Sequence, residues 1–312
     1  MAALNYAAQY AQALANEYPH VLHFGALYAT ENNGRYRMGE NGKSVYIPRI
    51  KTTGRIDSDR DSLAQAKRNF DNSWELKPLT HQRQWNTLVH PMDVQQTNDV
   101  ATITNITQVF NETQKFPEMD AFLISQLYAL WSTKDATDDE DVAMEADDTA
   151  LTSKNVLEVF DGMMEKMDEG LVPTNGRILY VTSGVHKLLK QAEGIVREMS
   201  VQQGGANVSR IINRLDEVEI VSVPSTLMKT AYDFDTGWKV DDGAEQINMF
   251  LVHPTAVITP VSYEFAQLDA PSATTNGKYY YFEESFEDVF ILNKRKAALQ
   301  FNVGESSPAA SV

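Results

Sequence analysis

The chain contains no cysteine among its 312 residues. Disulfides, zinc–thiolate sites and thiol nucleophiles are therefore excluded, and nothing in the sequence argues for secretion. No stretch approaches the roughly 18 consecutive apolar residues that a membrane-spanning helix requires. The first residues also lack the basic start and unbroken apolar core of a signal peptide. We therefore expect a soluble protein with no membrane partner.

Basic residues are scarce in this chain, which has 27 Lys and Arg against 43 Asp and Glu and a formal net charge of −16. A broad basic face that grips nucleic acid in a groove is therefore not expected for the chain as a whole. Hydrophobic residues make up 43% of the sequence, which is enough for a sizeable core. The length suits two domains or one large domain with insertions.

Familiar catalytic and nucleotide-binding motifs are absent as well. The segment RILYVTSGVHKLL at 177–189 has the strand–helix order of a nucleotide-binding unit, but no G-x-G-x-x-G, G-x-x-x-x-G-K-[ST] or G-x-S-x-G occurs. An enzyme built on residues 151–260 would need such a phosphate loop, or a nucleophile beside a base, and neither is found in the sequence. We therefore expect no enzyme and no cofactor.

Two candidate metal sites fail on their ligands. The stretch DSDRDS at 57–62 resembles the start of an EF-hand calcium loop, but Ser62 stands where that loop needs glycine and Arg68 where it needs a bidentate glutamate. His20 and His23 follow a proline and have no glutamate between them, which does not favour a zinc pair. No metal is expected at either place.

The longest regular element is predicted at residues 98–131, where apolar residues recur three and four positions apart. Asn98 can cap its start. Pro117 interrupts the run, because a proline pushes the preceding residue, Phe116, away from helical backbone angles. We therefore expect a first helix of about eighteen residues and a second helix that Pro117 opens as its first residue.

Two strands are predicted at residues 43–51 and 73–79, with a polar tip of about twenty residues between them. Pro48 and Pro78 cannot donate to a strand ladder, so both strands belong to sheet edges or to an open ribbon. A two-stranded ribbon is only marginally stable in water. Because this region is also rich in aromatic residues, we expect another surface to complete it.

The rest of the chain predicts a mixed α+β protein. Residues 3–18 suit an Ala-rich helix that is marginal alone, and residues 152–168 suit an amphipathic helix. Residues 135–148 hold eight acidic residues and no basic one, which favours a solvated loop, with calcium binding as the sharper alternative. Strands are predicted at 177–181, at 218–223, within 249–261 and within 279–303.

Four blocks of sequence resemble, in the same order, the major capsid proteins of tailed bacteriophages. They are QVFNETQKFPEMDAFLISQLYAL, RILYVTSGVHKLLKQ, RLDEVEIVSVPSTLMKTAYDF and MFLVHPTAVITPV. The resemblance covers roughly residues 35–303 and implies the α+β Hong Kong 97-type capsid fold, with a long spine helix. It implies an N-terminal arm at 1–34, an extended β-hairpin loop at 35–92, a peripheral domain at 93–134 and 251–303, an axial α/β domain at 135–250, and a tail at 304–312.

The same resemblance implies a function. The chain would assemble with itself, in hexamers and pentamers, into an icosahedral shell that encloses double-stranded DNA without sequence-specific binding. A portal protein would be a partner, and the protein would be found in the virion and, during assembly, in the host cytoplasm. Because only about 34 residues precede the loop, the resemblance implies a separate scaffolding protein or an already mature sequence. The alternative is an encapsulin-like non-viral compartment.

Contact with neighbouring subunits is expected from the arm and from the loop. No residue pattern among the lysines of the loop identifies one that cross-links covalently, so cross-linking is not predicted. The candidate subunit-contact residues are Tyr46, Ile47, Arg49, Phe70, Trp74, Leu76 and Trp85.

Overall fold

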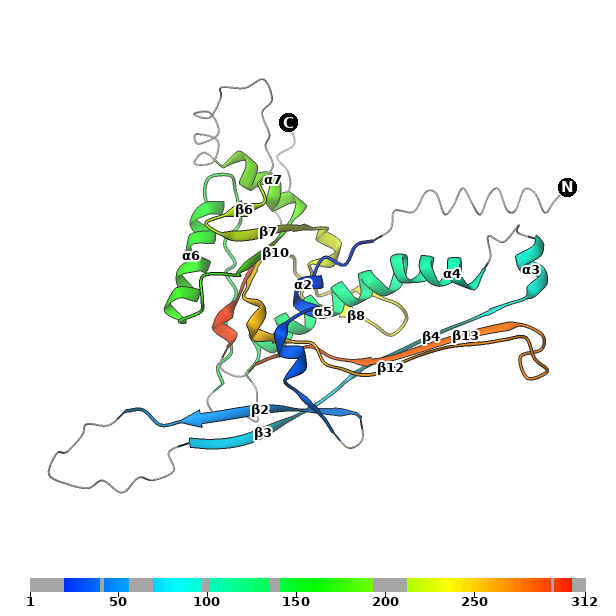
Figure 1. Cartoon of the computed structure of the whole chain (residues 1–312). Helices are drawn as coiled ribbons and strands as arrows, with labels where there is room; N and C mark the ends of the chain where they lie inside the picture. The colour runs from blue at the N-terminus through cyan, green and yellow to red at the C-terminus, as the bar shows by residue number, and fades with distance from the viewer. Residues whose placement is uncertain are drawn as a thin grey trace, which may run out of the picture.

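The computed structural model describes residues 20–39, 42–55, 70–96, 102–134, 141–192, 212–292 and 295–304. It has a body of helices and strands from which long elements project in opposite directions (Figure 1). The Ala-rich stretch 3–18 and the EF-hand-like stretch 57–62 lie outside the described residues.

The body is built on a five-stranded sheet in the order β15-β10-β5-β7-β6. Strands β5 and β7 pair in parallel, and the other neighbours pair antiparallel. Every residue of β5, β10 and β15 is buried, and most of these residues are apolar. The buried polar exceptions are Thr182, Asn248, Gln300 and Asn302. The strands predicted at 177–181 and 218–223 are confirmed. The bounds are β5 (Ile178–Thr182), β6 (Arg214–Leu215), β7 (Val218–Val223), β10 (Ile247–Val252) and β15 (Leu299–Val303).

Helices cover both faces of this sheet. Helices α6 (Val156–Glu169) and α7 (Ser183–Gln191) pack on one face, where Leu179 and Leu251 point. Helix α5 (Phe116–Ser132) packs on the other, where Trp131 lies 4.9 Å from the ring of Phe301. Successive side chains of a strand point to opposite faces, so a strand between two helical layers buries apolar side chains on both of its faces.

The long helix does not break at Phe116, so that prediction was wrong. Helix α4 (Ile103–Phe110) continues through a π-helical turn, η2 (Asn111–Lys115), into α5. Phe116 has helical angles, φ −65° and ψ −43°, and its N–H donates to Asn111 O five residues back. This wider turn carries the helix past Pro117, which cannot donate and would crowd a regular ladder. Thr102 caps the start of α4, and the expected cap, Asn98, lies outside the described residues.

The predicted ribbon is confirmed. Strands β2 (Ser44–Thr52) and β3 (Phe70–Pro78) pair antiparallel along their whole lengths. The short strand β1 (Arg37–Met38) pairs with β2 only near its start, so β2 has a neighbour on one side at Pro48. This agrees with the expectation that the proline lies on an open edge.

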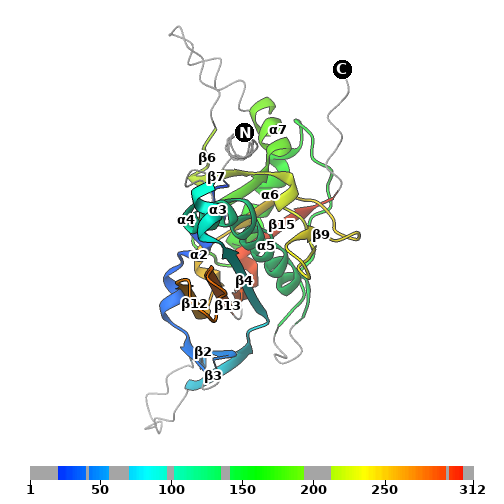
Figure 2. The same cartoon turned by 90° about the vertical axis from the view of Figure 1, so that its right-hand side faces the viewer.

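A second three-stranded sheet, in the order β12-β13-β4, projects from the body on the side opposite the ribbon (Figure 1). Its strands are β4 (His81–Val89), β12 (Val261–Asp269) and β13 (Tyr279–Glu287). Figure 2 shows helix α4 on one side of this sheet and the ribbon on the other. The smaller elements are α2 (Gly25–Tyr28), η1 (Glu31–Gly34), α3 (Pro91–Gln96), η3 (Ser225–Leu227), β8 (Tyr232–Asp233), β9 (Lys239–Val240), η4 (Pro254–Ala256), β11 (Val257–Ile258), β14 (Phe290–Ile291) and η5 (Lys296–Ala298).

Part of the acidic stretch is packed rather than solvated. Asp147 N donates to Phe301 O at 2.9 Å, and Val303 N donates to Asp147 O at 2.8 Å, which adds this residue to the edge of β15. Lys296 Nζ lies 2.6 Å from an Asp141 carboxylate oxygen. The expected solvated loop is therefore wrong at Asp141 and Asp147, whereas Glu145 and Asp148 are exposed as expected, and residues 135–140 lie outside the described part. Among the helices that the structure describes, none is long and apolar enough to cross a membrane.

Candidate functional site

One face of the ribbon is apolar and open. Residues that pair across an antiparallel ribbon share a face, so the register from Tyr46↔Leu76 to Thr52↔Phe70 brings the even-numbered residues of both strands together. The large side chains of this face remain exposed within the chain. The exposed fractions are Ile50 70%, Phe70 51%, Trp74 49% and Leu76 54%.

The opposite face of the ribbon anchors it to the body. Val45 and Ile47 are buried in a small core cluster with Ile258 and Phe290 of the β11–β14 pair. Beyond these two residues this face carries only polar and charged side chains, namely Arg49, Lys51, Asp71, Ser73, Glu75 and Lys77. The base of the ribbon is thus fixed, and its outer part projects with its apolar face open.

The structure separates the seven predicted contact residues into three groups. Tyr46, Phe70, Trp74 and Leu76 lie together on the apolar face, which also carries Pro48 and Ile50, two residues that are not among the seven. The alternation of apolar residues from Tyr46 to Ile50 was the sequence signal for both. Ile47 is buried in its own chain, and Arg49 lies on the opposite face. Trp85 is in β4 of the other sheet, where its ring stacks 3.9 Å from that of Phe110.

The sheet β12-β13-β4 has a second open face, on the side away from α4. Leu88 and Phe265 are exposed there, and Tyr280 and Phe282 lie beside them by register. The ring of Phe282 is 6.2 Å from that of Phe265 and 6.4 Å from that of Tyr280. This aromatic face also carries polar side chains by register, namely Gln82, Gln84, Asn86 and Glu284. It resembles the ribbon face in exposing large apolar side chains that the described part of the chain does not cover.

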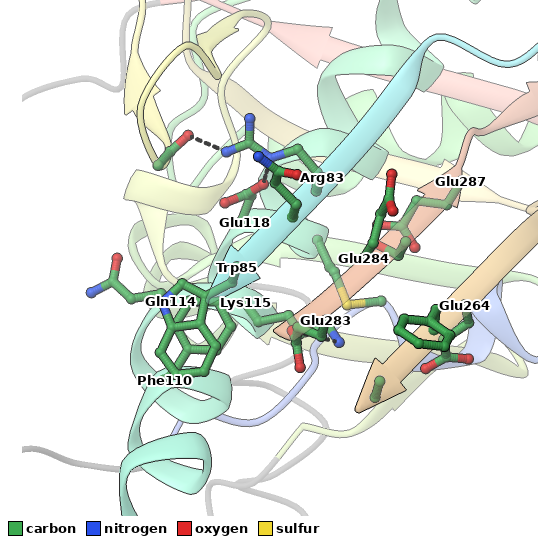
Figure 3. A pocket seen from close by; sticks show the side chains of 16 residues that line it. Arg83, Trp85, Phe110, Gln114, Lys115, Glu118, Glu264, Glu283, Glu284 and Glu287 are labelled. Carbon is green, nitrogen blue, oxygen red and sulfur yellow. Dashed lines mark hydrogen bonds and ion pairs between the residues drawn. The ribbon is translucent and has the colours of Figure 1, made fainter. Parts of the chain in front are cut away.

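Between the other face of this sheet and the long helix lies a cavity of about 200 Å³ (Figure 3). Arg83 Nε lies 2.5 Å from Glu118 Oε1, and Lys115 Nζ lies 3.3 Å from Glu283 Oε1. Arg83 also donates to the carbonyl oxygens of Phe234 and Gly237. The Trp85–Phe110 stack closes one wall. The helix and the sheet are therefore joined by ion pairs around an open interior.

Burial shifts the pKa values of groups beside this cavity. Burial raises the pKa of Glu287 to about 7; Lys115 opposes the rise, and the carboxylates of Glu118, Glu264 and Asp288 add to it. Burial lowers the pKa of His81, the β4 residue opposite Glu287, to about 4, and the nearby Arg83 contributes. Glu287 is thus partly protonated near neutral pH, and His81 is neutral there.

A buried carboxylate also fixes the chain ahead of α2. Asp120 of α5 lies 2.9 Å from His20 Nε2 and accepts the backbone N–H groups of His23 and Phe24. Burial raises the pKa of Asp120, and these three contacts oppose the rise. Within the described ranges, no three His, Asp or Glu side chains are grouped so that they could hold a metal ion.

This arrangement of ribbon, long helix and two sheets is the fold of tailed-phage capsid proteins, which confirms the expected fold. No protein-family model matches the chain, and no curated protein matches its sequence. The mature capsid of bacteriophage PhiM1 is similar in structure, with a TM-score of 0.62 and 13% identity over 87% of this chain and 85% of that one. The capsid of cyanophage P-SCSP1u gives 0.60 and 14% over 94% and 90%, and a structure from Mycobacterium phage Che8 gives 0.58 and 12% over 94% of both.

Proposed function

We propose that this chain is the major capsid protein of a tailed double-stranded DNA phage and builds the icosahedral shell of the head. The observation that carries the proposal is the exposed apolar face of a ribbon that projects from the body. Leaving such a face in water forgoes roughly 25 cal/mol for each Å² of apolar surface. A neighbouring copy that covers Ile50, Trp74 and Leu76 would recover this free energy, and the capsid-like fold supports such an assembly.

The direction of the two open faces favours a head-to-tail contact. The ribbon and the aromatic face of the sheet project to opposite sides of the body, so one chain does not cover its own sheet with its own ribbon (Figure 1). Ribbon residues 42–55 and 70–79 carry five basic and two acidic side chains, whereas β4, β12 and β13 carry five acidic and one basic. The ribbon of one copy therefore complements the sheet of the next. A head-to-tail contact of this kind closes into rings such as hexamers and pentamers.

The role proposed is structural rather than catalytic. A net charge of −16 suits a wall that encloses DNA without holding its phosphates in place. A portal protein and a separate scaffolding protein would be the partners, and the virion would be the final location after assembly in the host cytoplasm. The similar capsid structures come from phages, which supports a phage head over an encapsulin-like compartment.

Electron microscopy of the protein, expressed alone and together with its neighbouring genes, tests the proposal. Uniform hollow shells of many copies are expected. A monodisperse monomer or small oligomer under both conditions would contradict the proposed function. Co-expression with the neighbouring genes also distinguishes the two kinds of shell, because a phage head would incorporate a portal protein at one vertex.

A further inference from the structure

We propose that the cavity between the long helix and the β12-β13-β4 sheet is a receptor for a basic side chain, lysine or arginine, of a neighbouring copy. The inference rests on the proposed function, since it needs a second copy beside the first. It assigns to this cavity a ligand of defined chemistry, an ammonium or guanidinium group at the end of an alkyl chain.

The cavity has room for such a group. Its volume is about 200 Å³, whereas a single water needs roughly 10–15 Å³ of such space. The stacked rings of Trp85 and Phe110 form an apolar wall on one side, and carboxylates line the sheet side (Figure 3). The stems of Lys and Arg side chains pack on apolar surface while their charged ends seek polar partners.

The charge of the cavity is unbalanced toward the acidic side. Five glutamates line it, against the two cations Arg83 and Lys115. Each cation is already tied to a carboxylate, Arg83 to Glu118 and Lys115 to Glu283. Glu284 shares the aromatic face with Phe282 by register and accepts a hydrogen bond from Gln82. Glu264 and Glu287, on the helix side of the sheet, have no cation bound to them within the described part of the chain.

Glu287 is a second observation that points to a ligand, and it is independent of the charge imbalance. It lines the cavity and is largely buried, yet among the described residues its carboxylate makes no hydrogen bond or ion pair. Glu264 on the edge strand β12 likewise has none there. A buried carboxylate without a partner is unfavourable, and a charged donor that enters the cavity would satisfy it.

The titration of Glu287 agrees with this geometry. Burial, together with Glu118, Glu264 and Asp288, raises its pKa to about 7, and only Lys115 opposes this. His81, which faces it from β4, is neutral at that pH and supplies no positive charge. A lysine or arginine placed beside Glu287 would favour the ionised form and lower this pKa.

The ribbon of a second copy is the source of the basic group. It is a part of the chain where basic side chains outnumber acidic ones, although the chain as a whole is strongly acidic. The head-to-tail contact proposed above brings that ribbon to the sheet whose edge strand carries Glu264.

Zero-length cross-linking of assembled shells tests the inference. Shells are assembled from a mixture of ¹⁴N- and ¹⁵N-labelled chains and treated with a carbodiimide, which joins a lysine amine to a carboxylate in contact. Mixed-label cross-links are expected between Glu264 or Glu287 and a ribbon lysine. The Lys115–Glu283 pair, 3.3 Å apart in one chain, is the internal control and gives same-label products alone.

A carbodiimide does not couple arginine to a carboxylate, so a variant is needed to test an arginine as the ligand. Glu287→Gln removes a buried charge, so it should stabilise the isolated chain above pH 7. The same change should lower the urea midpoint for shell dissociation, because it removes the partner of the neighbour's cation. The exposed Glu158→Gln on α6 is the matched control and should change neither midpoint.

The two readouts keep the inference separate from the proposed function. Wild-type shells that give no such mixed-label cross-links, together with unchanged dissociation of Glu287→Gln shells, would overturn the cavity's role and leave the capsid assignment standing. Failure of the wild-type chain to form any shell would instead overturn the proposed function itself.

Discussion

The central sheet and the ribbon are both made of β-strands rich in apolar residues, yet they bury those residues very differently. In β5, β10 and β15 every residue is buried, because helices cover both faces of the sheet. In the ribbon, Ile50, Trp74 and Leu76 are exposed, because no described part of the chain covers their face. Composition alone therefore does not decide burial. The sheet stabilises the chain itself, whereas under the proposed function the ribbon would stabilise contact between chains.

The largest effect should come from opening a cavity in the central sheet. Phe250→Ala removes a fully buried ring that stacks 4.4 Å from Phe301. We expect the free energy of unfolding of the unassembled chain to fall by about 3–5 kcal/mol, measured by urea denaturation. The exposed Leu88→Ala is the control and should cost much less. Equal losses for the two variants would show that the comparison between buried and open faces is mistaken.

The next largest effect concerns the pH dependence of chain stability. The pKa of Glu287 rises from 4.5 to about 7 on folding, so the folded state binds more protons between these values, and stability falls as pH rises through that window. The loss is about 3 kcal/mol. His81, with its pKa lowered to about 4, acts in the opposite sense below pH 6.5.

Comparison with Glu287→Gln isolates the contribution of this group, because His81 is common to both proteins. Urea unfolding of the unassembled chains should show that the free energy of unfolding of the variant, relative to that of the wild type, is higher at pH 8 than at pH 5. Parallel stability profiles for the two proteins would contradict the assigned burial of Glu287.

A smaller effect is expected from the two tryptophans that the sequence analysis predicts as subunit contacts, Trp74 and Trp85, and the two substitutions should differ in what they destabilise. Trp74→Ala should change the stability of the unassembled chain by less than about 0.5 kcal/mol but should weaken each intersubunit contact by about 2 kcal/mol. Trp85→Ala should instead cost the chain about 1 kcal/mol, through loss of its stacking on Phe110.

Particle yield and the urea midpoint of unfolding, measured for both variants and the wild type, test these two predictions. Normal yield and morphology of Trp74→Ala shells would argue against the apolar face as an intersubunit surface.

The smallest effect is expected at the acidic stretch. Deleting residues 135–140 should leave assembly intact, as the sequence predicts for a solvated loop. Lys296→Met, which removes the ion pair with Asp141 against the body, should cost about 1 kcal/mol of chain stability. Particle counts and thermal melting measure the two changes. Loss of shells on deletion would show that this part of the loop makes contacts or binds a cation.

The sequence predicts the body well because its signals are local. The stretches 178–181 and 249–252 are unbroken apolar segments, which is typical of strands buried on both faces. The ribbon could also be predicted from the sequence, because Pro48 and Pro78 exclude their two strands from a central position in a sheet. Periodicity and proline rules act over a few residues and need no knowledge of the rest of the fold.

The features that the sequence did not predict depend on distant contacts or on local alternatives of similar energy. Trp85 was assigned to the ribbon region, but β4 pairs with β13, and Gln82 and Glu284 of this pair are 202 residues apart. The acidic sequence around Asp147 predicts a solvated side chain, and only the contact with β15, which is distant in sequence, shows that its backbone joins a sheet edge. At Phe116 the proline rule favoured a break, whereas a single π turn let the helix continue into its packed half. The cavity around Glu287 needs both sheet and helix, so no stretch of sequence reveals it.

The anchoring of the ribbon at Val45 and Ile47 gives it the mechanics of a lever. Phe70 pairs with Thr52, five residues beyond Ile47 along β2, which is about 17 Å of strand at roughly 3.3 Å per residue. A load on the outer end of the ribbon is therefore transmitted to a pivot of two side chains. That pivot rests on Ile258 and Phe290, so in the proposed shell the small β11–β14 pair would bear the torque applied to each subunit.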